Sequence, residues 1–235
     1  MTPDKDRNVV IVGGGFVGTA ARLLKVLSFI AAATFNSACA MLFPTEAGDS
    51  LAHFHDLAPR SGDSAPHFTL TDTAGNQVSL EQVIGDKPVV IQLGSYTCPV
   101  FRYRRFTMQP LRERYGDRVT FLVVYTQEAH PVGAPSPYRD EEWVPWINRL
   151  ARINVGQPPD LAARLDQARF ARQAMDANVR FLVDGDDDAV WRAYGAAPSP
   201  AFVLDRSGRV VLRQPWVVPG DIERILERLL SDQPP

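Results

Sequence analysis

The pattern of apolar and polar residues divides most of the chain into short strands and helices. Two continuous runs rich in β-branched residues, 89–93 (VVIQL) and 119–125 (VTFLVVY), are typical of buried strands. Between them, apolar residues recur at helical spacing from 101 to 115, and Gly116 marks the end of that helix. A strand–helix–strand unit of this kind predicts two parallel strands joined by a right-handed crossover.

Further elements are predicted on both sides of this unit. Alternating segments on either side of Asp72–Asn76 and of Asp205–Gly208 predict two β-hairpins. The remaining patterns predict amphipathic helices at 141–154, 160–175 and 221–230, a short helix at 189–194 and a strand at 178–183. The sequence therefore predicts an α/β protein with a central mixed sheet flanked by helices and with an N-terminal hairpin.

The first fifty residues do not fit this pattern. Residues 8–18 (NVVIVGGGFVG) match a strand followed by the G-x-G-x-x-G turn of dinucleotide-binding proteins, but no acidic residue follows between Thr19 and Thr45 to hold a ribose. Residues 26–43 form an uncharged run that is just long enough to span a membrane, and 37–40 resembles a small-residue cleavage site.

We therefore divide the chain into an N-terminal extension, 1–50, and a folded domain, 51–235, which begins near a linker at 58–66 rich in proline, glycine and serine. For the extension, three interpretations stay open: a weakly ordered segment or start-site artefact, a membrane tether, and a cleaved signal.

Composition narrows the class of function. The 25 basic and 27 acidic residues give a net charge of −2, so there is no electrostatic case for binding nucleic acid. The two cysteines, Cys39 and Cys98, form no C-x-x-C pair and indicate no disulfide framework. A reducing compartment fits best, and we expect a cytoplasmic protein, with membrane tethering through 26–43 as the alternative.

One cysteine stands where a fold can make a reactive sulfur. Gly94 and Ser95 end the first buried strand, and Cys98 then precedes Pro99, a residue suited to the first position of a helix. Unpaired N–H groups and the helix dipole at such a position favour the thiolate over the thiol. The alternative is a small buried cysteine with a structural role.

Two motifs then resemble a known family. The segment GSYTCPVF at 94–101 and the segment VVYTQEAHP at 123–131 resemble the iodothyronine deiodinases, whose motifs read Gly-Ser-Cys-Thr-selenocysteine-Pro-Pro-Phe and Tyr-Ile-x-Glu-Ala-His-Pro. That family is a branch of the thioredoxin-like, or redoxin, proteins and is related to peroxiredoxins. The resemblance implies a thioredoxin-like fold and a bacterial-type member with cysteine in place of selenocysteine.

The resemblance also implies roles for individual residues. Cys98 would be the nucleophile, and Glu128 and His130 would move a proton, since histidine titrates near neutrality.

From its position beside Cys98, Thr97 could donate a hydrogen bond to the thiolate, with a helix cap as the alternative. Arg102 lies one turn after Cys98 and could stabilise a thiolate or a peroxide oxygen. A solvated helix face is equally plausible for Arg104 and Arg105.

Three positions depart from the family or are less defined. Tyr96 stands where animal deiodinases have a second cysteine, so turnover would need an external thiol. At 154–156 the chain has no counterpart of the family's substrate-clamping histidine, which puts binding of a full thyronine in doubt. Thioredoxin-like proteins usually have a cis-proline opposite the cysteine, and Pro198 and Pro200 are the candidates.

We therefore expect a thiol-dependent oxidoreductase that removes iodine from an iodinated phenol. It would bind no cofactor and no metal, and would be reduced by a thioredoxin or a low-molecular-weight thiol; a homodimer stays open. A one-cysteine peroxidase resembling the peroxiredoxins is the alternative enzyme. A membrane-tethered binding module with a structural cysteine is the alternative of another class.

Overall fold

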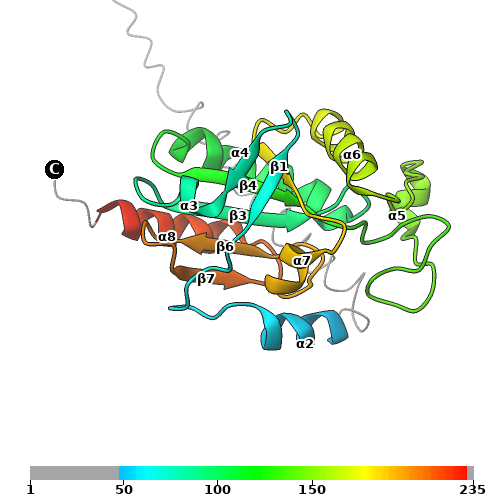
Figure 1. Cartoon of the computed structure of the whole chain (residues 1–235), viewed down its shortest axis with the longest axis horizontal. Helices are drawn as coiled ribbons and strands as arrows, with labels where there is room; N and C mark the ends of the chain where they lie inside the picture. Colours follow the sequence, from blue (N-terminus) through cyan, green and yellow to red (C-terminus); the bar gives the residue numbers. More distant parts are fainter. Residues whose placement is uncertain (1–47, 232–235) are drawn as a thin grey trace, which may run out of the picture. The chain divides into compact units, whose positions relative to one another are not determined.

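The computed structural model describes residues 48–231, with side chains from residue 53 onward. Within that range it forms a mixed sheet of seven strands in the order β2-β1-β5-β4-β3-β6-β7, with helices on both faces (Figure 1). The strands are β1 (Thr69–Asp72), β2 (Gln77–Ser79), β3 (Val89–Gly94), β4 (Thr120–Tyr125), β5 (Arg180–Val183), β6 (Ala201–Leu204) and β7 (Val210–Gln214). The helices are α2 (Gly48–Leu57), α3 (Leu80–Val83), α4 (Pro99–Tyr115), α5 (Trp146–Leu150), α6 (Leu161–Ala174), α7 (Ala189–Ala193) and α8 (Pro219–Ser231).

The central strand–helix–strand unit is confirmed. Strands β3 and β4 pair in parallel from Val89–Thr120 to Gly94–Tyr125, with α4 as the connection between them. Strand β5 pairs in parallel with β4, whereas β1 and β6 run antiparallel to their neighbours β5 and β3. The two hairpins, β1–β2 and β6–β7, form at the predicted places. Because β3 and β4 are parallel, the segments that follow them meet at one edge of the sheet.

Side chains along each strand point alternately to the two faces of the sheet, and a hydrophobic core forms on each face. In β3, Ile91 and Leu93 pack with residues of α2, α3 and α7, whereas Val90 faces the opposite side and packs with α4 and α8. On that opposite side, α4 and α6 also cover Phe181 of β5. Figure 1 shows α2 and α6 on opposite sides of the sheet. The helix that begins after Cys98 therefore packs on one face of the sheet, which it shares with α6 and α8.

Helix α2 lies before the predicted linker and belongs to the folded domain. Phe54 is fully buried and its ring lies 5.9 Å from that of Phe202 in β6. Arg213 of β7 donates hydrogen bonds to the carbonyls of Phe54 and Ala58 at the C-terminal end of this helix, where the helix dipole favours a cation. The predicted boundary between 1–50 and 51–235 stays a prediction, because residues 1–47 lie outside the described range.

One predicted helix is much shorter than expected. Of the segment 141–154, only Trp146–Leu150 is helical. The helix begins after Pro145, because proline disfavours a helical conformation in the residue before it. It ends before Arg152, which has a positive φ of 54°. Helix α6, by contrast, starts where the sequence predicts: the Asp160 side chain accepts a hydrogen bond of 2.8 Å from the N–H of Ala163.

The expected cis-proline is absent from the described residues, whose peptide bonds are all trans. Pro198 and Pro200 therefore both follow trans bonds, and the carbonyl of Pro200 accepts a 3.0 Å hydrogen bond from Leu93 N–H that extends the pairing of β6 with β3. None of the helices in the described range is long and apolar enough to cross a membrane. The G-x-G-x-x-G match at 8–18 and the segment 26–43 lie outside the described residues.

Candidate active site

Cys98 lies at the junction of β3 and α4. It is the N-cap residue of α4, Pro99 occupies the first turn, and the Cys98 side chain is only 1% exposed. The N–H of Cys98 donates to the carbonyl of Ser95 (3.2 Å), which forms a tight turn between strand and helix. Gly94 permits this turn to pack closely, because a Cβ atom there would lie 2.3 Å from the ring of Phe101. The structure thus places the sulfur at the positive end of a 17-residue helix.

A buried carboxylate is hydrogen-bonded to the cysteine loop, as we call Ser95–Cys98 between β3 and α4. Glu128, in the segment after β4, accepts hydrogen bonds from the Thr97 N–H (2.8 Å), the Thr97 hydroxyl (2.7 Å) and the Tyr125 hydroxyl. Its side chain is fully buried, and this burial raises the pKa of Glu128 although the hydrogen bonds oppose the effect. Burial and the neighbouring carboxylate also raise the pKa of Tyr125 well above its usual value. Glu128 therefore binds a proton more readily than an exposed glutamate does.

His130 joins the same network through Thr97. The N–H of His130 donates to the Thr97 hydroxyl oxygen (2.9 Å), so that hydroxyl links His130 to Glu128. The ring nitrogen Nδ1 lies 3.1 Å from the Trp143 carbonyl, which can only accept, so Nδ1 carries the proton and Nε2 is a bare acceptor. Burial lowers the pKa of His130 to about 4. The expectation of a histidine that titrates near neutrality is therefore corrected: at pH 7 the ring is neutral.

Arg102 and Asn148 hold the cysteine loop through hydrogen bonds to its backbone carbonyls. Arg102 donates to the carbonyl of Tyr96 and to Oδ1 of Asn148 (2.6 Å), and Asn148 Nδ2 donates to the carbonyl of Thr97 (2.7 Å). The charge of Arg102 interacts favourably with Cys98 and Glu128, although burial lowers the pKa of Arg102. An arginine in this position favours a negatively charged sulfur.

The segment after β4 is fixed by three further side chains. The Ser95 hydroxyl oxygen accepts from the N–H of Ala129 (2.9 Å), and the Ser136 hydroxyl donates to the Ala129 carbonyl (2.8 Å). Gln157 both accepts from the Glu128 N–H (2.8 Å) and donates to the Glu128 carbonyl (3.1 Å). The position of Glu128 therefore depends on residues that are far from it in the sequence.

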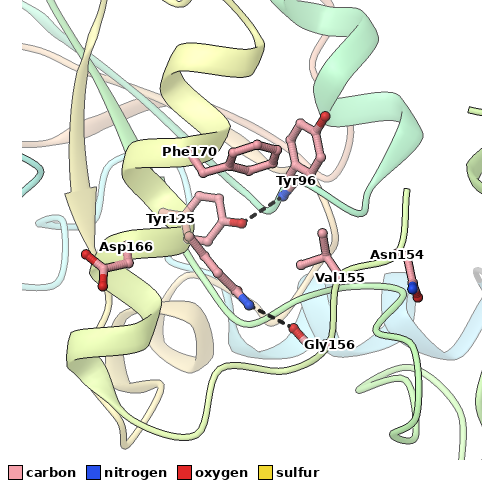
Figure 2. Close-up of a pocket in the computed structure, with 8 residues that line it drawn as sticks. Tyr96, Tyr125, Asn154, Val155, Gly156, Asp166 and Phe170 are labelled. Atoms are coloured by element: carbon pink, nitrogen blue, oxygen red, sulfur yellow. Dashed lines mark hydrogen bonds between the residues drawn. The ribbon is translucent and has the colours of Figure 1, made fainter. Parts of the chain in front are cut away.

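The structure brings the residues singled out from the sequence to one edge of the sheet: Tyr96, Thr97, Cys98, Arg102, Glu128 and His130. The ring of Tyr96 points toward Phe170 of α6, at a centroid distance of 5.2 Å (Figure 2). The roles of all six residues stay predictions. Sequence reasoning missed Ser95, Tyr125, Asn148 and Gln157, although Ser95 and Tyr125 lie inside the two motifs that were recognised.

The chain matches known proteins in both sequence and structure. The family model described as iodothyronine deiodinase matches residues 49–221. Thyroxine 5-deiodinase of Homo sapiens is 37% identical over 152 residues, which cover 64% of this chain and 46% of that protein. The enzyme of the same name from Ovis aries is 28% identical over 152 residues, covering 64% and 48%. The chain thus spans about half the length of the curated relatives that it matches.

Solved structures show the same fold at low sequence identity. The thioredoxin domain of a thiol-disulfide oxidoreductase from Bacteroides vulgatus has a TM-score of 0.50 and 18% identity, covering 72% of this chain and 99% of that one. An uncharacterized conserved protein from Geobacillus kaustophilus has a TM-score of 0.54 and 20% identity, covering 74% and 84%. The predicted thioredoxin-like fold is confirmed.

Proposed function

This chain belongs to the iodothyronine deiodinase family, and on that premise we propose that it is a thiol-dependent oxidoreductase in which Cys98 removes iodine from an iodinated phenol. One observation carries the proposal. The cysteine that replaces the family's selenocysteine caps a long helix, beside a half-buried arginine, and the adjacent Thr97 connects to both Glu128 and His130. This arrangement combines a nucleophile with groups that can hold a proton.

The reaction is balanced with an external thiol as the reductant. The Cys98 thiolate attacks iodine, an S–I bond forms, and the C–I electron pair stays on the ring carbon, which takes up a proton. A thiol then attacks the Cys98 sulfur and iodide leaves, and a second thiol attacks the mixed disulfide and frees Cys98. The sum converts one aryl iodide and two thiols into the arene, iodide, one proton and one disulfide.

The proton that the ring carbon takes up can come from the hydrogen-bond network of Glu128, Thr97 and His130. Burial raises the pKa of Glu128, so this carboxyl group binds a proton more readily than an exposed one does, and the Thr97 hydroxyl connects it to the cysteine loop. His130 is neutral and its Nε2 can accept a proton. Glu128 is therefore the proposed proton donor, and the neutral ring of His130 is the proposed hydrogen-bond acceptor of the site.

The experiment measures iodide release from 4-iodophenol and from thyroxine by the full chain, with dithiothreitol as the reductant. Wild type is compared with Cys98→Ser, which keeps the shape of the site and removes the nucleophile. We expect release by the wild type and a loss of at least a hundredfold, about 3 kcal/mol of activation free energy, in the variant. Equal release by both proteins, or release by neither, would refute the proposal.

A one-cysteine peroxidase is the second candidate. The favourable interaction of Arg102 with Cys98 would also stabilise a thiolate that attacks a peroxide oxygen and becomes a sulfenic acid. The same two proteins are tested for hydrogen peroxide consumption with dithiothreitol. Consumption that depends on Cys98, without iodide release, favours the peroxidase. If Cys98 reacts with neither peroxide nor an alkylating reagent, a binding module is favoured.

A further inference from the structure

A pocket of about 310 Å³ lies next to the cysteine loop. Five of its lining residues matter here and define what we call the ring pocket: Tyr96, Tyr125, Gly156, Gln167 and Phe170. They come from the cysteine loop, the end of β4, the segment between α5 and α6, and α6 itself. Figure 2 shows the rings of Tyr96 and Phe170 side by side on one side of the ring pocket, with Gly156 across from them.

The walls of the ring pocket are suited to a flat aromatic group. The Tyr96 and Phe170 rings meet edge to face at a centroid distance of 5.2 Å, and the Tyr125 ring also lines the pocket. Phe170 is 52% exposed, so much of its ring surface is open to a ligand. A third ring would cover this exposed surface and add favourable aromatic contacts.

The ring pocket also contains a hydrogen-bond acceptor that is not satisfied within the described residues. The side chain of Gln167 donates from Nε2 to the Gly156 carbonyl (3.0 Å), and this bond fixes the orientation of the amide. Its other atom, Oε1, is buried and has no hydrogen-bond partner. A buried acceptor without a partner is rare and costly, and a donor on a ligand would satisfy it.

We infer that the ring pocket binds one aromatic ring that carries a hydroxyl group, with the hydroxyl donating to Gln167 Oε1 and the ring packing on Phe170. The inference rests on the proposed function in taking this ring to be that of the substrate. A volume near the lower end of the range for small-molecule sites, about 300–1,000 Å³, suits a single ring. The substrate class is therefore a monocyclic halogenated phenol rather than a two-ring diphenyl ether.

The ring pocket is connected to the reactive loop. Tyr96 lies two residues before Cys98 in the sequence, and the Tyr125 hydroxyl accepts from the Tyr96 N–H (3.3 Å) and donates to Glu128. One wall of the ring pocket, the Tyr125 side chain, thus belongs to the same network that holds the cysteine loop. A ring bound there lies beside the loop and in contact with the residues that position it.

The test measures binding, not turnover. The full chain with Cys98→Ser is titrated by calorimetry with 4-iodophenol and with 4-iodoanisole, which has the same ring but lacks the hydroxyl donor. We expect iodophenol to bind about 3- to 10-fold more tightly, the value of one neutral hydrogen bond. Equal binding of the two ligands, or tighter binding of iodoanisole, would overturn the inference.

Two further substitutions locate the site. Gln167→Leu should abolish the preference for iodophenol, and Phe170→Ala should weaken both ligands by about 3- to 10-fold. The matched control is Phe106→Ala, which removes another exposed phenylalanine (56% exposed) that does not line the ring pocket, and it should change neither affinity. If Phe170→Ala folds normally and binds both ligands as before, the ring is bound elsewhere.

A two-ring ligand tests the size limit and separates the two proposals. Thyronine should bind no more than about twofold tighter than phenol, and a tenfold advantage would overturn the single-ring class. Iodophenol binding in the ring pocket without iodide release by the wild type would refute the proposed function alone. Iodide release with a KM that Phe170→Ala leaves unchanged would refute the ring pocket alone.

Discussion

Asn148 offers a direct test of how the cysteine loop is held in place. Its side chain is 1% exposed and bridges two groups of the site: Nδ2 donates to the Thr97 carbonyl (2.7 Å) and Oδ1 accepts from Arg102 (2.6 Å). Replacing Asn148 by alanine would leave both the carbonyl and the guanidinium without this partner. We therefore expect Asn148→Ala to destabilise the protein and to reduce the activity of Cys98 together.

The magnitude follows from the two bonds. A neutral hydrogen bond contributes about 1 kcal/mol and one to a charged group about 2 kcal/mol, so the free energy of unfolding should fall by about 3 kcal/mol. For a domain of this size, each kcal/mol shifts Tm by about 2–4 °C, which gives a decrease of about 6–12 °C. The Asn148→Asp variant keeps an acceptor for Arg102 but loses the donor to Thr97, and should lose about a third as much stability, about 1 kcal/mol.

The assays are thermal unfolding followed by circular dichroism and iodide release at a temperature where all variants are folded. Asn178→Ala is the matched control, because Asn178 is an exposed asparagine and its loss should change the free energy of unfolding by less than about 0.5 kcal/mol. A Tm for Asn148→Ala within about 2 °C of the wild type would show that the two hydrogen bonds of Asn148 contribute little to the free energy of unfolding. Full activity in a destabilised Asn148→Ala would show that these hydrogen bonds support the fold but not the reaction.

Two further predictions concern His130 and Gly94. Because the pKa of His130 is lowered to about 4 from 6.5, the unfolded chain binds more protons between these values, so stability should fall as the pH drops from 6.5 to 4. In urea unfolding, His130→Gln should lose about 3 kcal/mol less than the wild type over this range, and parallel pH profiles would contradict the assignment. Gly94→Ala should lower the free energy of unfolding by about 1–3 kcal/mol, because its Cβ would lie 2.3 Å from the Phe101 ring. The control is Gly220→Ala, where no atom lies within 4 Å of the added Cβ; equal stability of the two variants would contradict the steric argument.

The sequence was most informative where a local pattern determines structure. The apolar runs at 89–93 and 119–125 predicted a parallel pair, because buried strands have few polar residues and the intervening helix has its own periodicity. Pro99 predicted the start of α4 and thereby the capping position of Cys98. These features depend on residues that are close together in the chain.

The sequence was less informative where contacts between residues far apart in the chain determine the structure. Asn148 reaches the Thr97 carbonyl across 51 positions, and Gln157 reaches Glu128 across 29, and nothing local distinguishes either residue from a surface amide. The place of helix α2 in the domain depends on Phe54 packing against β6 and on Arg213, and both β6 and Arg213 lie far from this helix in the sequence. The pKa of His130 was misjudged for the same reason, since its burial depends on the segment around Trp143.

The burial of Cys98 has a consequence for the timing of the proposed reaction. With Cys98 only 1% exposed, neither an aryl iodide nor a reducing thiol can reach its sulfur until the covering side chains move aside. Both reactants need the same sulfur and therefore the same opening. One turnover thus requires the opening at least twice, with the first product leaving before the reductant enters. The burial of Cys98 thereby favours a reaction in two separate stages. After the deiodinated product has left and before the thiol binds, the enzyme with modified Cys98 is free of both ligands.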